Sequence, residues 1–175
     1  ESAARAGFDS VTLDMQHGAH DPVSVMRAIG SVVMAGKPAV VRVPVGDVAM
    51  ASRALDMGAA AIIAPMINSP ADAEALVEAT KYPPVGERSW GATRAIQLKR
   101  TDAASYLAAA NRETVVFAMI ETVAALDALD AILAVPGLDA VFIGPSDLSI
   151  ALANGASVDP MRADNQAAAT RVREA

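Results

Sequence analysis

The sequence contains no cysteine, which excludes disulfide bonds and thiolate–metal sites and fits a cytoplasmic protein. Aromatic residues make up only 3% of it, although 53% of its residues are hydrophobic, so aliphatic side chains and Met must build the core. No apolar run reaches the ~18–20 residues that span a bilayer, and no signal-peptide pattern opens the chain. A formal net charge of −6 argues against nucleic acids or anionic membranes as partners. We expect a single domain over residues 1–175.

Short apolar runs alternate along the chain with longer segments of helical pattern, which indicates an α/β fold. The short runs are continuously apolar rather than alternating, as is typical of parallel strands covered on both faces. Several helical patterns open with a capping residue followed by Pro, as at Asp21-Pro22 and Ser69-Pro70. The predicted strands are 11–15, 39–44, 61–66, 115–121 and 140–145, and the predicted helices are about 21–35, 47–57, 70–82, 101–112 and 123–134, with a last one opening at Asp159-Pro160.

Two architectures fit this alternation, a doubly wound sheet and a (β/α)8 TIM barrel. No glycine-rich phosphate-binding motif follows any predicted strand, which disfavours the nucleotide-binding doubly wound folds. Polar residues occur at the carboxyl ends of most strands, where barrel enzymes place their chemistry. We therefore predict a (β/α)8 barrel. Because such barrels have about 250 residues, we expect the first strand to precede residue 1 and the last two to follow residue 175.

Glu121 and Asp147 each end an apolar run, one βα repeat apart. Both carboxylates should therefore lie over the same end of a parallel sheet, where their oxygens suit a hard divalent cation. Water and a chelating 2-oxo acid could fill the other positions around such an ion. The alternative is two acids at helix N-termini, favoured there by the helix dipole.

A second group of polar residues follows the first two strands. Asp14 could hold one imidazole nitrogen of His17 and leave the other as a base, or His17 could be an ordinary loop residue. Arg42 lies inside an apolar strand, and an arginine buried there must meet an anion. It could clamp a carboxylate or enolate with its fork of donors, or form a structural ion pair with one of the acids.

The segment Gly144-Pro145-Ser146 precedes a helix, so its backbone N–H groups could bind a substrate carboxylate, although an ordinary turn is the alternative. Around residues 82–91, the cationic side chains could form a solvated face or close over an anionic substrate. Methionines such as Met57 and Met66 are expected in the core. The cationic side chains around residues 82–91 are Lys81, Arg88 and Arg94.

Several of these motifs together resemble the HpcH/HpaI aldolases, which are metal-dependent pyruvate aldolases on a (β/α)8 barrel. The resemblance spans nearly the whole chain, and the pairing of IET with GPSDLS is its most specific part. The motifs, in order, are GFDSVTLDMQHG at 7–18, AVVRVP at 39–44, IIAPMINS at 62–69, YPPVGERSWG at 82–91, IET at 120–122 and VFIGPSDLS at 141–149.

The resemblance implies cleavage of 4-hydroxy-2-oxo acids, such as 4-hydroxy-2-oxoheptanedioate, to pyruvate and an aldehyde. It implies that Glu121 and Asp147 hold Mg²⁺, Mn²⁺ or Co²⁺ while pyruvate chelates the ion. Arg42 would stabilise the enolate, and His17, oriented by Asp14, would manage the proton of the aldol hydroxyl. The Ser146 backbone would bind the pyruvate carboxylate. Homotrimers or homohexamers are also implied.

Two positions depart from the family pattern, since Met119 and Gln16 stand where many members carry Gln and Glu. Both departures bear on substrate preference. No lysine lies at a strand end among the core motifs, which favours a metal route over a Schiff base. The alternatives are a citrate-lyase-β-like or malyl-CoA-type lyase, which would need a surface for CoA, and a catalytically silent barrel that serves as a binding module.

Overall fold

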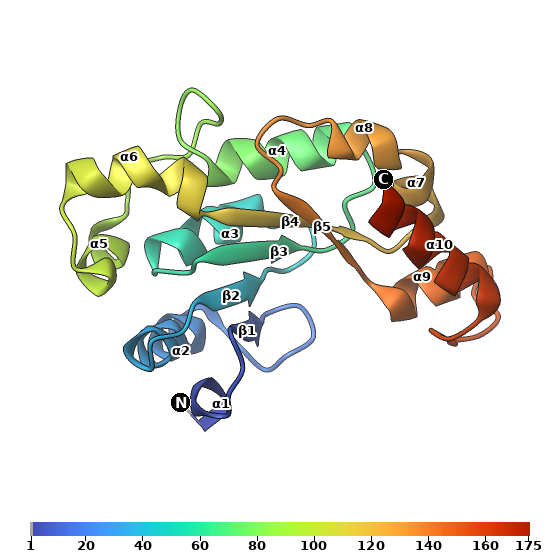
Figure 1. Ribbon diagram of the computed structural model, residues 1–175, viewed down its shortest axis with the longest axis horizontal. Helices are drawn as coiled ribbons and strands as arrows, with labels where there is room; N and C mark the ends of the chain where they lie inside the picture. Colours follow the sequence, from blue (N-terminus) through green and yellow to red (C-terminus); the bar gives the residue numbers. More distant parts are fainter. Residues whose placement is uncertain (1) are drawn as a thin grey trace.

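The computed structural model describes residues 2–175, and its centre is a five-stranded parallel sheet (Figure 1). The strands are paired in chain order, each beside the one before it. A doubly wound sheet reverses its strand order at a switch point, whereas a (β/α)8 barrel adds each strand beside the last. The order confirms the barrel-type fold. The strands are β1 (Val11–Asp14), β2 (Ala39–Arg42), β3 (Ala61–Ala64), β4 (Val115–Ile120) and β5 (Ala140–Ile143).

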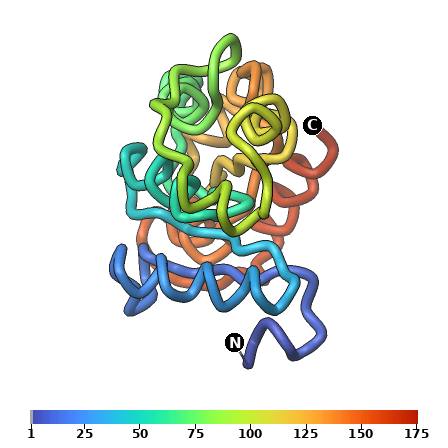
Figure 2. The backbone as a smooth tube through the Cα atoms, turned by 90° about the vertical axis from the view of Figure 1, so that its left-hand side faces the viewer, coloured from blue at the N-terminus to red at the C-terminus, as the bar shows by residue number. Residues whose placement is uncertain are grey.

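Helices follow the strands and lie in an arc around the sheet (Figures 1 and 2). Side-chain caps start several of them at the predicted places: Asp21 accepts from the Ser24 amide at 2.7 Å, and Asp47 from the Met50 amide at 2.8 Å. The helices are α1 (Ser2–Arg5), α2 (Pro22–Met34), α3 (Val48–Asp56), α4 (Pro70–Thr80), α5 (Thr93–Lys99), α6 (Ala103–Glu113), α7 (Val123–Asp127), α8 (Leu129–Leu133), α9 (Pro145–Leu152) and α10 (Ala163–Glu174).

Three helical regions differ from the sequence prediction. Helix α5 was not predicted, because it lies within the turn-rich excursion between β3 and β4. The predicted helix 123–134 is divided into α7 and α8 at Ala128, whose ψ of 6° leaves the helical range. The last helix begins at Ala163 rather than at Asp159-Pro160.

The core lies between the sheet and its helices, and the central strand β3 is buried along its whole length. Both outer strands, β1 and β5, are less covered, and Phe142 on β5 is 43% exposed. Among residues 2–175, no helix is both long enough and apolar enough to cross a membrane.

Lys81, at the end of α4, is almost completely buried with 1% of its surface exposed. Its ammonium donates to the carbonyl of Asn111 at 2.9 Å, to the carbonyl of Thr114 at 2.6 Å and to Asp139 Oδ2 at 2.7 Å. Lys81 thereby ties α4 to the segment leading into β4 and to the residue before β5. Neither interpretation from the sequence, a solvated face or a closure over substrate, is correct for it.

The two arginines of the same region are also structural. Arg88, 4% exposed, donates from Nη2 to Asp56 Oδ1 at 2.7 Å, and its guanidinium carbon lies 4.6 Å from the centre of the Tyr82 ring. Arg94 donates from Nη2 to the Met26 carbonyl at 3.1 Å. Both therefore join α3 or α2 to the excursion between β3 and β4, and the two interpretations from the sequence are wrong for them too.

Replacing Lys81 by Met should lower the free energy of unfolding by about 2–4 kcal/mol, because three acceptors lose a charged donor in a buried place. Denaturant unfolding of the purified protein measures the change. The control is Lys99→Met, which removes an exposed ion pair to Glu113 at 2.7 Å and should cost less than about 1 kcal/mol. Equal losses in the two variants would contradict the structural role of Lys81.

Candidate active site

The carboxyl ends of β1, β2, β4 and β5 surround a cavity of about 400 Å³. All but two of the predicted site residues line it, which confirms that the strand ends bring them together. The exceptions are Asp14, which contacts Arg42, and Glu121, which lies beneath the cavity wall. The lining residues are His17, Arg42, Met119, Phe142, Gly144, Pro145, Ser146 and Asp147.

Glu121 is 1% exposed and directly follows β4. Its Oε1 accepts a hydrogen bond from the Met66 amide at 2.7 Å, while its buried Oε2 has no hydrogen-bond partner among the described residues. Burial raises the pKa of Glu121 above its ordinary value, and the nearby charge of Asp147 adds to this rise. An unpaired buried carboxylate oxygen is costly. A cation bound at Oε2 would offset this cost.

Gly144 makes room for the Glu121 carboxylate. A Cβ atom at this position would collide with Glu121 Oε2, and it would lie 2.8 Å from Glu121 Cβ and 3.1 Å from Met119 Cε. Any larger residue would therefore displace the acid or the start of α9. This steric need is a second reason for the glycine, beside the predicted use of its backbone for substrate binding.

Met66 is a member of the site that the sequence did not indicate. It has a left-handed backbone with φ of 57° and is 36% exposed, so the prediction that it fills the core is wrong. Its conformation presents the amide to Glu121. Every residue except proline carries this donor, so no side-chain pattern could have identified it. Met57, by contrast, packs against the core as predicted.

Arg42 and Asp14 form an ion pair with two hydrogen bonds. Arg42 Nε donates to Asp14 Oδ1 at 2.8 Å, and Nη2 donates to Oδ2 at 2.5 Å. The two residues are register partners on adjacent strands, so the pairing follows from the sheet. The guanidinium holds the pKa of Asp14 well below its ordinary value. Arg42 thus forms a structural ion pair, and it also lines the cavity.

The structure corrects the expectation that Asp14 holds the ring of His17. Asp14 Oδ1 instead accepts from the backbone amides of Gln16 at 3.0 Å and His17 at 3.3 Å, while the guanidinium of Arg42 takes both carboxylate oxygens. Asp14 therefore shapes the turn that carries His17. The His17 side chain is exposed at the cavity.

Two carboxylates are the acidic groups available to a metal ion in this cavity. Asp147 is exposed on the first turn of α9, and its charge acts on both Glu121 and Arg42. Residues 2–175 contain no group of three or more His, Cys, Asp or Glu side chains placed to hold an ion. The unpaired Glu121 Oε2 and the oxygen-only donor set fit a hard divalent cation that keeps several positions for small ligands.

The two departures from the family pattern lie beside this site. Met119 is 2% exposed, lines the cavity and places its methyl group close to Gly144. Gln16 has a buried Oε1 with no hydrogen-bond partner among the residues described. The wall next to Glu121 is thus apolar at Met119.

Comparison with known proteins gives consistent matches over this chain. The family model described as HpcH/HpaI aldolase/citrate lyase matches residues 1–175. Hydroxypyruvate/pyruvate aldolase of Rhizorhabdus wittichii is 40% identical over 99% of this chain and 68% of its own length. For 2-keto-3-deoxy-L-rhamnonate aldolase of Salmonella gallinarum, the identity is 36% over 87% of this chain and 57% of that protein.

A crystal structure of an HpcH/HpaI aldolase from Desulfitobacterium hafniense DCB-2 superposes with a TM-score of 0.89 at 32% identity. The superposition covers 99% of this chain and 66% of that chain. The chain spans between 55% and 68% of the length of the curated relatives compared with it.

The raised pKa of Glu121 predicts how stability depends on pH without metal. A carboxyl with a raised folded-state pKa contributes stability below its ordinary pKa of 4.5, and this contribution is lost as the pH rises through the folded value. Gln cannot ionise. In a buffer with chelator, Glu121→Gln should therefore gain stability over the wild type near neutral pH and lose that advantage in acid.

Denaturant unfolding across the pH range measures this difference. The control is Glu113→Gln, which alters an exposed carboxylate paired with Lys99 and should change the pH dependence little. A Glu121→Gln variant that is less stable than the wild type near neutral pH would contradict the raised pKa.

Proposed function

Because the chain belongs to the HpcH/HpaI aldolase/citrate lyase family, we propose that it is a divalent-metal-dependent aldolase that cleaves 4-hydroxy-2-oxo acids to pyruvate and an aldehyde. Relatives named as aldolases of pyruvate and of a keto-deoxy sugar acid support this reaction class. The observation that carries the proposal is the buried, unpaired Oε2 of Glu121 beside a cavity that Arg42 and Asp147 line.

Glu121 and Asp147 would hold the ion, with Mg²⁺, Mn²⁺ or Co²⁺ as the candidates. When bound, the ion supplies a Lewis acid for the keto oxygen of the substrate. Glu121 brings one free oxygen, since the Met66 amide already occupies the other. The exposed Asp147 faces no such competitor among the described residues.

Arg42 would stabilise the charge that develops during cleavage. As the bond between C3 and C4 breaks, its electron pair moves into the pyruvate fragment, and negative charge collects on the keto oxygen of an enolate. A guanidinium held in advance stabilises that charge without reorganisation. Its two bonds to Asp14 provide this fixed orientation.

His17 would take part in proton transfer. Ser146 would bind the substrate. The aldol hydroxyl gives its proton to His17, directly or through water, as the aldehyde carbonyl forms. A proton then adds to the enolate carbon to complete pyruvate. The backbone at Ser146, in the first turn of α9, would bind the pyruvate carboxylate together with Gly144 and Pro145, which line the same cavity.

A lyase for CoA thioesters is the second candidate, because the matching family also includes citrate lyases. Cleavage of a malyl-CoA-type thioester faster than of any 4-hydroxy-2-oxo acid would replace the aldolase proposal. A silent barrel is disfavoured because a binding module has no need of a buried unpaired carboxylate. Assembly as a trimer or hexamer stays a prediction of the resemblance, and a cytoplasmic location stays a prediction from the absence of cysteine.

Metal dependence can be tested on pyruvate alone. Exchange of the pyruvate methyl protons for deuterium, followed by NMR, should require Mn²⁺ or Mg²⁺ and stop with EDTA, because enolate formation needs the Lewis acid. Asp147→Asn should abolish the exchange, while Asp127→Asn, an exposed acid on α7, should leave it unchanged. Exchange that resists both EDTA and Asp147→Asn would refute the metal assignment.

Arg42→Lys should lower kcat by at least about tenfold, because an ammonium cannot hold Asp14 and the substrate oxygen with one planar fork. Steady-state cleavage assays with a 4-hydroxy-2-oxo acid measure this loss. Arg53→Lys, at an exposed position of α3, is the control and should keep the wild-type rate. A near-normal rate for Arg42→Lys would show that Arg42 is only a structural ion-pair partner.

A further inference from the structure

The first turn of α9 carries Pro145, Ser146 and Asp147 but lacks a cap of its own. Gly144 is its N-cap residue, and no side chain caps the helix among the residues described. Most other helices of the chain begin under a Ser, Thr or Asp cap, as α4 does with Ser69. The side-chain contacts to the turn that brings Asp147 to the cavity therefore come from other positions than its N-cap.

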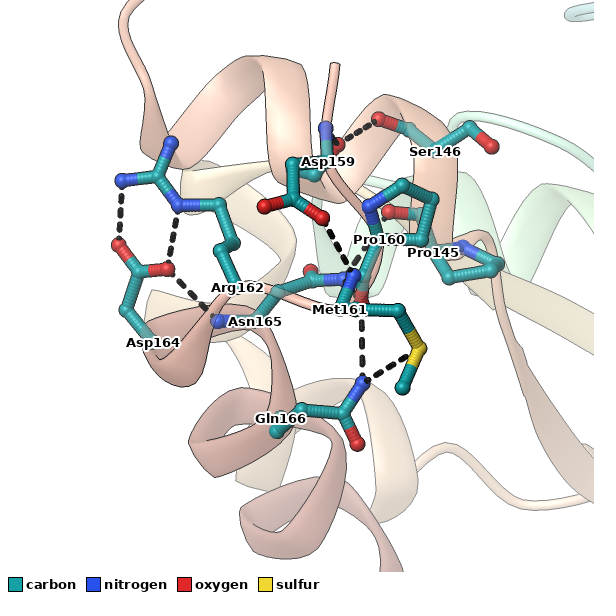
Figure 3. Close-up of polar contacts among 10 residues, drawn as sticks. Pro145, Ser146, Asp159, Pro160, Met161, Arg162, Asp164, Asn165 and Gln166 are labelled. Atoms are coloured by element: carbon teal, nitrogen blue, oxygen red, sulfur yellow. Dashed lines mark hydrogen bonds and ion pairs between the residues drawn. The ribbon is translucent and has the colours of Figure 1, made fainter. Parts of the chain in front are cut away.

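Asn165, in the first turn of α10, supplies a contact to this turn (Figure 3). Its Nδ2 donates to the Pro145 carbonyl at 3.1 Å and to the Pro160 carbonyl at 2.8 Å. The side chain is 1% exposed. One amide group thus joins α10, the loop before it and the first residue of α9, across twenty positions of sequence.

Ser149 holds the next carbonyl of the same turn. Its hydroxyl donates to the Ser146 carbonyl at 2.7 Å and accepts from the Asp159 amide at 3.1 Å, and the residue is fully buried. The 159–165 segment therefore bonds the Pro145 carbonyl directly, through Asn165, and reaches the Ser146 carbonyl only through the Ser149 hydroxyl. Asp147 is the next residue.

The first turn of α10 has no side-chain cap either, but it carries local polar contacts. Arg162 makes a two-bond ion pair with Asp164, at 2.6 and 2.8 Å, and Asp164 Oδ1 accepts from the Asn165 amide at 2.8 Å (Figure 3). Asp164 thereby holds the backbone amide of Asn165. A fixed side chain can orient what it binds, whereas a mobile one cannot.

Packing alone does not account for an asparagine here. The Oδ1 atom of Asn165 is buried and has no hydrogen-bond partner among the described residues, which is costly for an amide. An apolar side chain of similar volume would fill the space without that cost. An apolar residue would lose the bonds from Nδ2 to Pro145 and to Pro160, and only the bond to Pro145 reaches α9.

We infer that Asn165 is a positioning residue for the active site, which sets the first turn of α9 and with it the Asp147 carboxylate and the Ser146 backbone. This inference rests on the proposed function, because it assigns Asn165 to the placement of a proposed metal ligand. Asn165 acts through Pro145 and touches neither metal nor substrate. Groups that bond a metal ligand directly typically change metal affinity or activity by about 10–100-fold when removed, and Asn165 acts one step further away, through the Pro145 carbonyl.

Two variants of the purified protein test the inference. Asn165→Leu removes the amide, and Asn165→Asp keeps the shape but replaces the Nδ2 donor with an oxygen. Both should weaken Mn²⁺ binding, measured by calorimetry, by about tenfold, and raise KM for pyruvate more than they lower kcat. Gln166→Leu is the control, because Gln166 also donates to Pro160, at 2.9 Å, but makes no bond to α9.

A measurement without metal separates the inference from the proposed function. The Leu148 amide donates to the Gly144 carbonyl at 3.0 Å and closes the first turn of α9. Its hydrogen exchange should be at least about tenfold faster in both Asn165 variants and unchanged in Gln166→Leu. A wild-type protein that binds no Mn²⁺ would refute the proposed function, whatever this exchange shows.

The inference is overturned if the Asn165 variants keep wild-type Mn²⁺ affinity and Leu148 exchange. A lower melting temperature with both of these unchanged would also overturn it, since that result shows a structural role only. If Asn165→Leu does not fold, Asn165→Asp, which conserves the volume, decides the question by the same two measurements.

Discussion

The burial of one carboxylate, that of Glu121, is the constraint on which the rest of the site depends. A buried acid is tolerated where its oxygens are paired, and here, within residues 2–175, only Oε1 is paired, by the Met66 amide. The surroundings are adapted to this group: Gly144 leaves it room, and Met66 holds a left-handed backbone in front of it. The fold therefore holds the Glu121 carboxylate in an environment that is unfavourable unless a positively charged group binds at Oε2.

Charged side chains of both signs lie around this acid. Arg42 and Asp14 neutralise each other across adjacent strands, so the cavity keeps a fixed guanidinium without a free positive charge. Asp147 stays outside this pair and is exposed. The carboxylates of Glu121 and Asp147 thus stay outside the ion pair, and both act electrostatically on Arg42.

The sequence allowed much of the fold to be predicted, because local rules decide it. Asp21, Asp47 and Ser69 begin helices where their side chains can cap them, and the continuous apolar runs are the five strands. The position of Glu121 directly after β4 also follows from this pattern, whereas Asp147 lies beyond the end of β5, in the first turn of α9. Interactions between distant segments could not be predicted in the same way. Lys81 near a turn-rich loop resembles a surface residue until three acceptors from two other segments enclose it.

Strand β4 is held at both ends by polar contacts, one to a lysine ammonium and one made by a glutamate carboxylate. Before its first residue, the Thr114 carbonyl accepts from the Lys81 ammonium, and after its last residue Glu121 accepts from Met66. A slip of the strand by one residue would exchange its two faces, separate both contacts at once and turn the acid away from the cavity. An ammonium group at one end of β4 thus helps to keep the other end in register, so a substitution far from the cavity could displace Glu121 while the residues that line the cavity stay intact.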